Sequence, residues 1–243
     1  MSTVLLLGAG SDMAIAMARK FASEKYQLQL AGRQVSALMP LQKDLQVRYG
    51  VSATVHAFDA TDFSSHAAFY ASLPTPPDIT ICVFGYLGDQ QKGQEHWEEA
   101  AAIINSNYTG AVSVLNIVAA DYDKRKQGII IGISSVAGER GRQSNYLYGS
   151  AKAGFTAYLS GLRNRLFRSG VHVMSVQPGF VNTRMTQHLS LPPLLTAQPE
   201  EVASAVFRAM LKKKNVLYVK WQWKYIMLII KSIPEGIFKK LSL

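Results

Sequence analysis

Cysteine is almost missing from this chain of 243 residues, which contains only Cys82. A single cysteine excludes an internal disulfide and is typical of a reducing compartment. The sequence also lacks a charged leader before its first apolar stretch, so no secretory signal peptide is expected and a cytoplasmic location is predicted. The composition, 48% hydrophobic and 17% charged, is that of a globular protein and excludes a disordered one.

Acidic residues are scarce towards the carboxyl terminus. Nine of the 26 Lys and Arg lie at or after Arg208, against a single acid, Glu235. The rest of the chain is nearly neutral, so a basic partner surface is expected only in the tail, residues 220–243. No motif typical of nucleic-acid binding accompanies these lysines, and no nucleic-acid partner is predicted.

A membrane-spanning run is missing as well. The uninterrupted apolar run of the tail, residues 225–230, has six residues, whereas a spanning helix needs about 20. Pro234 is expected to divide the tail into two short helices. Aromatic residues beside lysines are typical of a segment that lies on an anionic membrane surface. The apolar face could equally pack on the domain or on a second subunit, and these interpretations do not exclude one another.

Short apolar runs recur along the remainder of the chain, and helical patterns separate them. This alternation favours a parallel sheet covered on both faces, in a single doubly wound α/β domain over residues 1–219. The segment 181–199 has three prolines and no clear periodicity, which is typical of a functional lid. Strands are predicted at 4–7, 27–31, 51–57, 79–84, 129–133, 171–176 and 216–219, and helices near 13–21, 34–49, 62–72, 97–123 and 146–168.

Ser135, Tyr148 and Lys152 form the most informative pattern. Tyr148 and Lys152 are four residues apart and therefore share one face of a helix. A nearby ammonium favours phenolate and is expected to lower the pKa of the phenol below its usual ~10. A serine hydroxyl at a strand end could hold a substrate oxygen against that phenol, an arrangement for moving a proton on or off an alcohol or carbonyl oxygen. Ser134 is a rival, but the thirteen-residue spacing to Tyr148 favours Ser135.

With these residues in place, the chain resembles the short-chain dehydrogenase/reductase family over roughly residues 3–219. The resemblance implies a Rossmann-type parallel sheet of about seven strands, reduction of a small-molecule ketone to a secondary alcohol or the reverse, assembly as a homodimer or homotetramer, and no metal. The matching segments are Gly8-Ala-Gly10, Ala31-Gly32-Arg33, Phe58-Asp59-Ala60, Asn107-Tyr-Thr-Gly110, Ile133-Ser-Ser135-x-x-Gly138, Tyr148-x-x-x-Lys152 and Gln177-Pro178-Gly179 with Thr183.

The resemblance assigns four residues to catalysis. Ser135 would hydrogen-bond the substrate carbonyl oxygen, and Tyr148 would deliver the proton to it. Lys152 would bind the nicotinamide ribose and lower the pKa of the phenol, while Asn107 would hold a water that links Lys152 to solvent. The expected cofactor contacts are Gly8, Gly10, Ser11, Arg33, Asp59, Gly85, Tyr148, Lys152, Pro178, Gly179 and Thr183.

Arg33 decides the expected cofactor. An acid at the end of the second strand pairs with the ribose of NAD, whereas an arginine accommodates the additional phosphate of NADP. The segment Ala31-Gly32-Arg33 contains no acid, so NADP(H) is favoured over NAD(H). The alternative is that Arg33 is a solvated surface charge.

Two segments depart from the family pattern. Asp12 and Ala14 stand where the family usually has glycine, and Asp12 places a carboxylate near the phosphate site unless it caps the following helix and points outward. Residues 82–84 replace the usual two asparagines and alanine, and only Gly85 remains. These departures motivate the alternative of a non-catalytic sensor or scaffold that binds NADP(H).

The tail is similar to that of one branch of the family, the reductases of keto sugars attached to a polyprenyl phosphate. That similarity implies a lipid-linked ketone as the substrate and a site of action at the cytoplasmic membrane surface. The shared features are the Trp/Tyr–basic start of the tail, Ile233-Pro234, the segment 237–241, and the run from Pro178 to Met185.

Overall fold

The computed structural model of the chain describes residues 2–187 and 189–241; His188 of the predicted loop and Ser242 and Leu243 of the predicted tail lie outside this part. Seven strands form one sheet, and every neighbouring pair in it is parallel. The predicted doubly wound α/β fold is therefore confirmed. In spatial order the strands are β3 (Ala53–Ala57), β2 (Gln27–Gly32), β1 (Thr3–Leu7), β4 (Ile79–Cys82), β5 (Ile129–Ile133), β6 (His172–Pro178) and β9 (Val216–Val219).

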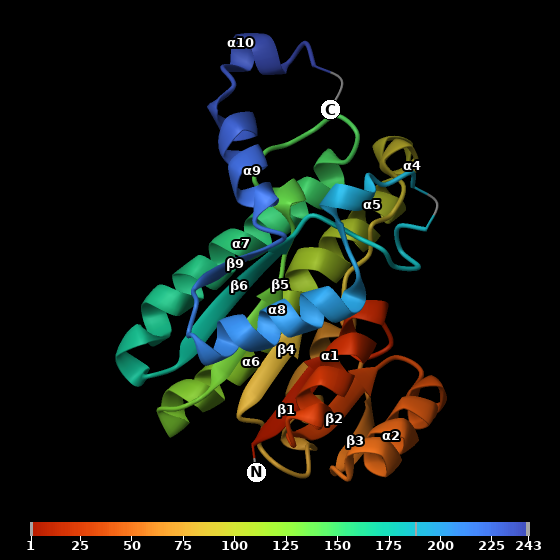
Figure 1. Cartoon of the computed structure of the whole chain (residues 1–243), viewed down its shortest axis with the longest axis vertical. Helices are drawn as coiled ribbons and strands as arrows, with labels where there is room; N and C mark the ends of the chain where they lie inside the picture. The colour runs from red at the N-terminus through yellow and green to blue at the C-terminus, as the bar shows by residue number, and fades with distance from the viewer. Residues whose placement is uncertain (1, 188, 242–243) are drawn as a thin grey trace.

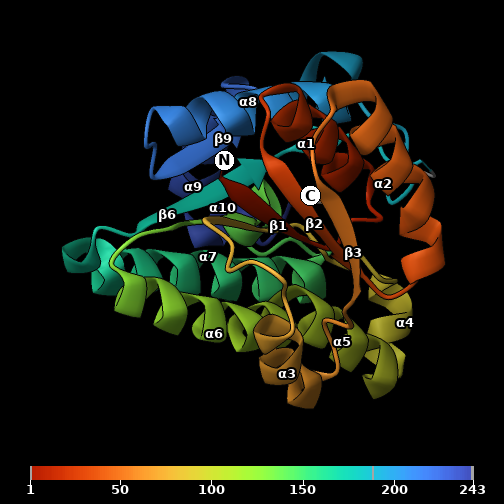
Figure 2. The same cartoon turned by 90° about the horizontal axis from the view of Figure 1, so that it is seen from below.

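Helices cover both faces of the sheet, as Figure 2 shows. One face carries a core cluster contributed by α1 (Asp12–Ser23), α2 (Val35–Tyr49) and α8 (Pro199–Leu211). The opposite face carries a second cluster from α3 (His66–Ala71), α6 (Gly110–Arg125) and α7 (Tyr146–Leu166). Because the central strands contact a helix layer on each side, they are mostly apolar, and every residue of β1 is buried.

Several elements differ from the sequence prediction. The long helix expected near 97–123 consists of α5 (Trp97–Ile104), a π-helical turn (Asn105–Thr109) and α6, and the short helix α4 (Gln90–Glu95) precedes it. The sequence prediction missed α8, although Pro199 occupies its first position and the Glu201 carboxylate accepts a bond from the Gln198 amide, two signals of a helix start.

The loop 181–199 has a paired base. Its two ends, β7 (Phe180–Val181) and β8 (Thr196–Ala197), form a short parallel ladder. After β9 the chain continues as α9 (Gln222–Ser232) and α10 (Glu235–Phe238), the two short helices predicted on either side of Pro234. Both lie at one end of the molecule, and α10 projects beyond the sheet (Figure 1). Within the described residues, no helix combines the length and apolarity that crossing a membrane requires.

Candidate active site

Most of the predicted site residues follow the carboxyl ends of neighbouring strands. Because the strands are parallel, their carboxyl ends meet at one edge of the sheet, which is where open α/β sheets bind ligands. Gly8 follows β1, Arg33 follows β2, Asp59 lies shortly after β3, and Ser135 lies shortly after β5. Gly85 and Gly179 similarly follow β4 and β6.

The turn after β1 needs glycine for two reasons. Gly8 has a φ of +91°, and a Cβ on it would lie 2.7 Å from the Cβ of Phe84. Its amide and that of Ala9 both donate to the Ala31 carbonyl at 2.9 Å, which ties the turn to β2. Gly10 faces open space, because the only heavy atom near its missing Cβ is a Leu38 methyl at 4.0 Å.

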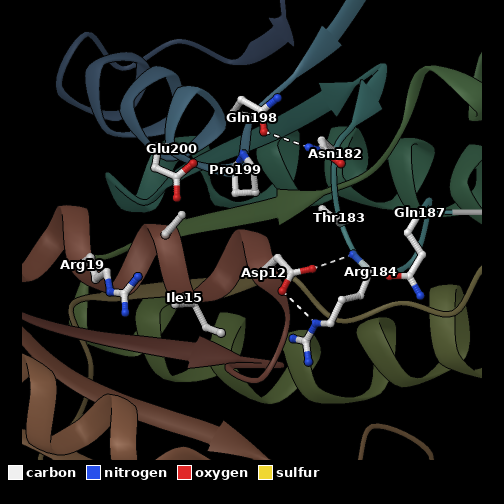
Figure 3. Close-up of a pocket in the computed structure, with 11 residues that line it drawn as sticks. Asp12, Ile15, Arg19, Asn182, Thr183, Arg184, Gln187, Gln198, Pro199 and Glu200 are labelled. Carbon is white, nitrogen blue, oxygen red and sulfur yellow. Dashed lines mark hydrogen bonds and ion pairs between the residues drawn. The ribbon is translucent and has the colours of Figure 1, made fainter. Parts of the chain in front are cut away.

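Ser11, and not Asp12, caps helix α1. The Ser11 hydroxyl accepts a bond from the Ala14 amide at 3.2 Å. Asp12 is the first helical residue, and its carboxylate binds Arg184 of the loop 181–199 (Figure 3). The predicted alternative of a capping aspartate is therefore wrong. The prediction could not find the ion pair, because Arg184 is distant in the sequence.

Arg33 and Asp59 lie at the ends of adjacent strands. The Arg33 side chain is exposed directly after β2. The Asp59 carboxylate accepts bonds from the amide of Thr61 at 2.8 Å and from its hydroxyl at 2.7 Å. These bonds, with a smaller contribution from the charge of Arg33, hold the pKa of Asp59 below its usual value. Asp59 is therefore a carboxylate at neutral pH.

Gly85, Asn107 and Lys152 lie close together just beyond the carboxyl end of β4. A Cβ on Gly85 would lie 2.7 Å from Oδ1 of Asn107 and 3.4 Å from Nζ of Lys152. Asn107 is buried in the π-helical turn, where its Nδ2 donates to the carbonyls of Tyr86 and, at 2.8 Å, Ile103. Its Oδ1 accepts a 3.3 Å bond from the Tyr86 amide. Such π-helical turns are frequent at functional sites because they aim a side chain out of the helical register.

The two candidate serines have different partners. Ser134 is buried, and its hydroxyl lies 3.0 Å from the Lys152 carbonyl and 2.6 Å from the hydroxyl of Thr156, both on α7. Ser135 caps the short 3-10 turn Val136–Gly138 by accepting from the Ala137 amide at 3.1 Å. Ser135 also interacts with the Tyr148 phenol and lowers its pKa. Ser134 therefore joins β5 to α7, and Ser135 is the serine that faces the tyrosine.

Lys152 is 4% exposed and lies on the same side of α7 as Tyr148. Its Nζ is 5.7 Å from the centre of the Tyr148 ring and donates to the Ile133 carbonyl at 3.1 Å. Burial lowers the pKa of Lys152 to about 8, and the neighbouring Cys82 slightly opposes this shift. The ammonium is thus placed beside the phenol, but it is strongly desolvated.

The pKa of Tyr148 differs from the sequence prediction. Burial raises it to about 12, and the bond from Ser135 offsets only part of that rise. The expected lowering by Lys152 is therefore not found. Burial of the phenol disfavours phenolate, and no lowering of the Tyr148 pKa comes from Lys152. Tyr148 is a neutral phenol at pH 7.

Gly179 has a packing role that the sequence did not predict. Pro178 ends β6 and pairs with Val219 of β9. A Cβ on Gly179 would lie 1.9 Å from the indole of Trp223 in α9, so only glycine leaves room for that ring. Thr183 lies in the turn beyond β7, where its amide donates to the Thr186 hydroxyl at 3.2 Å.

A groove of about 600 Å³ lies between α1, the loop 181–199 and the start of α8 (Figure 3). Asp12, Thr183 and Arg184 line it on the side of the turn after β1, and Gln198 and Glu200 line it opposite. Asn107, Ser135, Tyr148 and Lys152 are not among its lining residues. The groove therefore borders the turn after β1 without being the place where the predicted proton transfer would occur.

Similarity to known proteins identifies the family. A family model described as short chain dehydrogenase matches residues 2–192. This chain belongs to the short-chain dehydrogenase family. An uncharacterised oxidoreductase of Mycobacterium tuberculosis is 32% identical over 241 residues, which cover 98% of this chain and 96% of that protein. The NADP-dependent 3-hydroxy acid dehydrogenase of Schizosaccharomyces pombe is 25% identical over 88% of this chain and 89% of its own length.

Solved structures agree on the architecture. A short-chain dehydrogenase from Sphingobium yanoikuyae in complex with NADPH superimposes with a TM-score of 0.83 and covers 97% of this chain and 98% of its own, at 22% identity. At that identity the similarity concerns the fold alone. These similarities do not support the narrower resemblance of the tail to reductases of polyprenyl-linked keto sugars.

In this short-chain dehydrogenase, α9 packs against the residues that follow Ser135. Trp223 and Met227 of α9 form a small cluster with Val136, the residue after Ser135. Arg140, a few residues further on, donates to the carbonyls of Ile230 at 2.7 Å and Ile233 at 2.6 Å, at the end of α9. Its guanidinium also binds Glu235 at 3.0 Å and stacks on Phe238. The sequence prediction did not identify Arg140, because an arginine in a polar loop carries no signal of its distant partners.

Proposed function

We propose that this short-chain dehydrogenase is an NADP(H)-dependent oxidoreductase that reduces a ketone to a secondary alcohol, or catalyses the reverse reaction. The observation that carries the proposal is the convergence of Ser135, Tyr148 and Lys152 at the carboxyl edge of the sheet, with Nζ of Lys152 5.7 Å from the Tyr148 ring. A site for binding alone has no need of a serine that faces the phenol.

Tyr148 is the proton donor in this proposal. At neutral pH Tyr148 is a neutral phenol, so it carries the proton that the carbonyl oxygen takes up as that oxygen gains negative charge. The Ser135 hydroxyl holds that oxygen. When bound, the cofactor supplies the hydride that reaches the carbonyl carbon. Lys152, whose lowered pKa eases release of a proton, restores the proton lost by Tyr148. The water that we assign to Asn107 links Lys152 to solvent, from which Lys152 regains its proton.

The predicted cofactor residues fit a dinucleotide. The open Gly10 and the turn at Gly8 and Ser11 expose backbone at the start of α1, where a pyrophosphate binds. We assign the exposed Arg33 to the 2′-phosphate of NADP(H) and Asp59 to the adenine. The NADPH in the Sphingobium protein and the NADP dependence of the Schizosaccharomyces enzyme support this choice. Gly85, Pro178, Gly179 and Thr183 complete the proposed cofactor contacts.

The Tyr148→Phe variant tests the proposed function. Fluorescence titration measures NADPH binding, and NADPH oxidation measures turnover on a panel of aliphatic, cyclic and sugar ketones. We expect the variant to bind NADPH within about twofold of the parent and to lose a factor of about 100 or more in turnover, the contribution of a general acid. Equal turnover by both proteins would show that the proton comes from elsewhere. A parent that binds NADPH but reduces no ketone would favour the sensor alternative.

We further propose that α9 rests on an anionic membrane surface and that the ketone is lipid-linked. The outer side of α9 and the residue before it expose Trp221, Tyr225 and Ile229, and Lys224 lies beside them. Trp223 and Met227 occupy the inner side, so the domain covers only part of the apolar surface of the helix. Aromatic and aliphatic groups beside lysines suit the headgroup region, where each lysine contributes about 1 kcal/mol.

Vesicle co-sedimentation tests the membrane proposal. We expect the parent to sediment with vesicles that contain an anionic lipid, and Ile229→Glu to remain in solution. Val47→Glu is the matched control, because Val47 is also exposed but lies on α2. If Ile229→Glu instead changes only the oligomeric state seen by light scattering, the outer side of α9 is a subunit contact. We also propose that the chain forms a homodimer or homotetramer through α5, α6 and α7, the helices typical of the family. Light scattering on the parent measures this oligomeric state.

A further inference from the structure

Asp12, the first residue of α1, places a negative charge next to the turn where a phosphate would bind. The structure gives its carboxylate a specific partner. Its Oδ1 accepts from Nε of Arg184 at 2.8 Å, and its Oδ2 accepts from the Arg184 amide at 2.7 Å. The Nη2 group of the same guanidinium donates to the Gly10 carbonyl at 2.7 Å. One arginine of the loop 181–199 is thus bound to both the glycine turn and the first residue of α1 (Figure 3).

The position of Arg184 is fixed from the loop side as well. The ladder between β7 and β8 closes the base of the loop, and the Asn182 amide adds a bond to the Ala197 carbonyl at 2.9 Å. Next to it, the Thr186 amide donates to the Thr183 carbonyl at 3.0 Å, which forms a tight turn that contains Arg184. The loop therefore holds the backbone of Arg184, and Asp12 and Gly10 hold its guanidinium.

The guanidinium retains capacity for a further acceptor. An arginine side chain carries five N–H donors, and the bonds to Asp12 and Gly10 engage Nε and Nη2. About two-thirds of the Arg184 side chain is exposed beside the open Gly10. Guanidinium is the side-chain group whose planar geometry best matches a phosphate.

We propose that Arg184 binds the pyrophosphate of the dinucleotide, and that Asp12 is the residue that positions Arg184 for this purpose. The inference rests on the proposed function. The Asp12 carboxylate alone would repel the phosphates, but paired with Arg184 it adds no net charge, and the guanidinium is held beside the turn by its bond to the Gly10 carbonyl. Arg184 thus replaces contacts that a glycine in place of Asp12 would provide through its backbone, and the loop becomes part of the cofactor site.

A double-mutant cycle with NADPH titration tests the inference. The four proteins are the parent, Arg184→Gln, Asp12→Asn and the double variant, each checked for folding by thermal melting. We expect Arg184→Gln to weaken NADPH binding about tenfold or more, because charge-assisted bonds to phosphate are lost. We expect Asp12→Asn to weaken it about threefold at most, and the double variant to match Arg184→Gln. Arg184→Lys should recover part of the affinity, since it retains the charge.

Three other results would overturn the inference. If Asp12→Asn tightens binding and the double variant matches the parent, Arg184 only neutralises Asp12. If Asp12→Asn is as harmful as Arg184→Gln, the pair is only a structural link. Unchanged affinity in Arg184→Gln excludes any role in binding. A folded parent that does not bind NADPH refutes the proposed function itself, whereas the comparison among variants concerns Arg184 alone.

Discussion

The contact between Gly179 and Trp223 predicts that one added methyl group, in Gly179→Ala, displaces α9 from the domain. In Gly179→Ala the new Cβ would lie 1.9 Å from two atoms of the indole, well inside the 3.0 Å below which real Cβ contacts are essentially never found. The ring would have to move by more than 1 Å. Its bond to the Leu195 carbonyl at 3.0 Å and its edge-to-face contact with Phe180 at 5.2 Å would then be lost.

The expected cost follows from what Trp223 buries. Complete removal of a buried tryptophan costs about 3–5 kcal/mol, and a displaced ring recovers part of that, so we expect about 3 kcal/mol. In a protein of this size 1 kcal/mol shifts the melting temperature by about 2–4 °C, so the melting temperature of Gly179→Ala should fall by roughly 6–12 °C.

Tryptophan fluorescence reports the same event directly. Trp223 is 4% exposed, whereas Trp97 and Trp221, the other two tryptophans, are 70% and 69% exposed. Displacement of Trp223 should therefore shift the emission to the red. Gly161→Ala is the matched control, because nothing lies within 4 Å of its missing Cβ and the substitution within α7 should stabilise the helix by up to about 1 kcal/mol. A Gly179→Ala protein with the emission and melting temperature of the parent would refute the reasoning.

Three further predictions concern Lys152, Gly85 and Arg140. Because burial lowers the pKa of Lys152 from 10.5 to about 8, the folded protein binds fewer protons there than the unfolded chain between these pH values, and this group adds stability as pH rises through that window. Lys152→Met should therefore be more stable than the parent by about 3 kcal/mol at pH 7, with an advantage that shrinks at pH ~9.5 in denaturant titrations; an equal difference at both pH values would contradict this. Gly85→Ala should cost about 1–3 kcal/mol in thermal unfolding and weaken NADPH binding, because its Cβ displaces the Asn107 side chain. Arg140→Gln should accelerate hydrogen exchange in α9 by leaving carbonyls at its end unpaired, whereas Arg19→Gln, which loses an exposed ion pair to Asp44, should not.

The parallel sheet was predictable because its signal is local. Apolar runs of four to seven residues separated by helical patterns require a sheet covered on both faces, and the boundaries differ from the prediction by only a few residues. The residues that make up the candidate site were predictable for the same reason. Gly8, Gly85, Ser135 and Gly179 each come at or just after the end of a strand, so parallel strands alone bring them to one edge.

Local pattern could not reveal contacts between distant segments. Judged from its neighbours in the sequence, Asp12 is a poor residue beside a phosphate-binding turn. Its partner Arg184 is 172 positions away and meets it only in the folded chain. Gly179 reads as a generic turn residue until Trp223 fills the space beside it. The loop 181–199 reads as irregular, although its ends pair. In each case the partner is chosen by the packing of the whole chain, which a window of neighbouring residues does not contain.

The sequence by itself determined which groups could exchange a proton, because four residues of separation on a helix place Tyr148 and Lys152 on one side. Only the tertiary structure decided their pKa values. Charge proximity, which the sequence does encode, predicted a phenol more acidic than usual, but burial raises the pKa of Tyr148 and lowers that of Lys152. Desolvation depends on every atom that excludes water from the two groups, and those atoms come from segments spread over the whole chain.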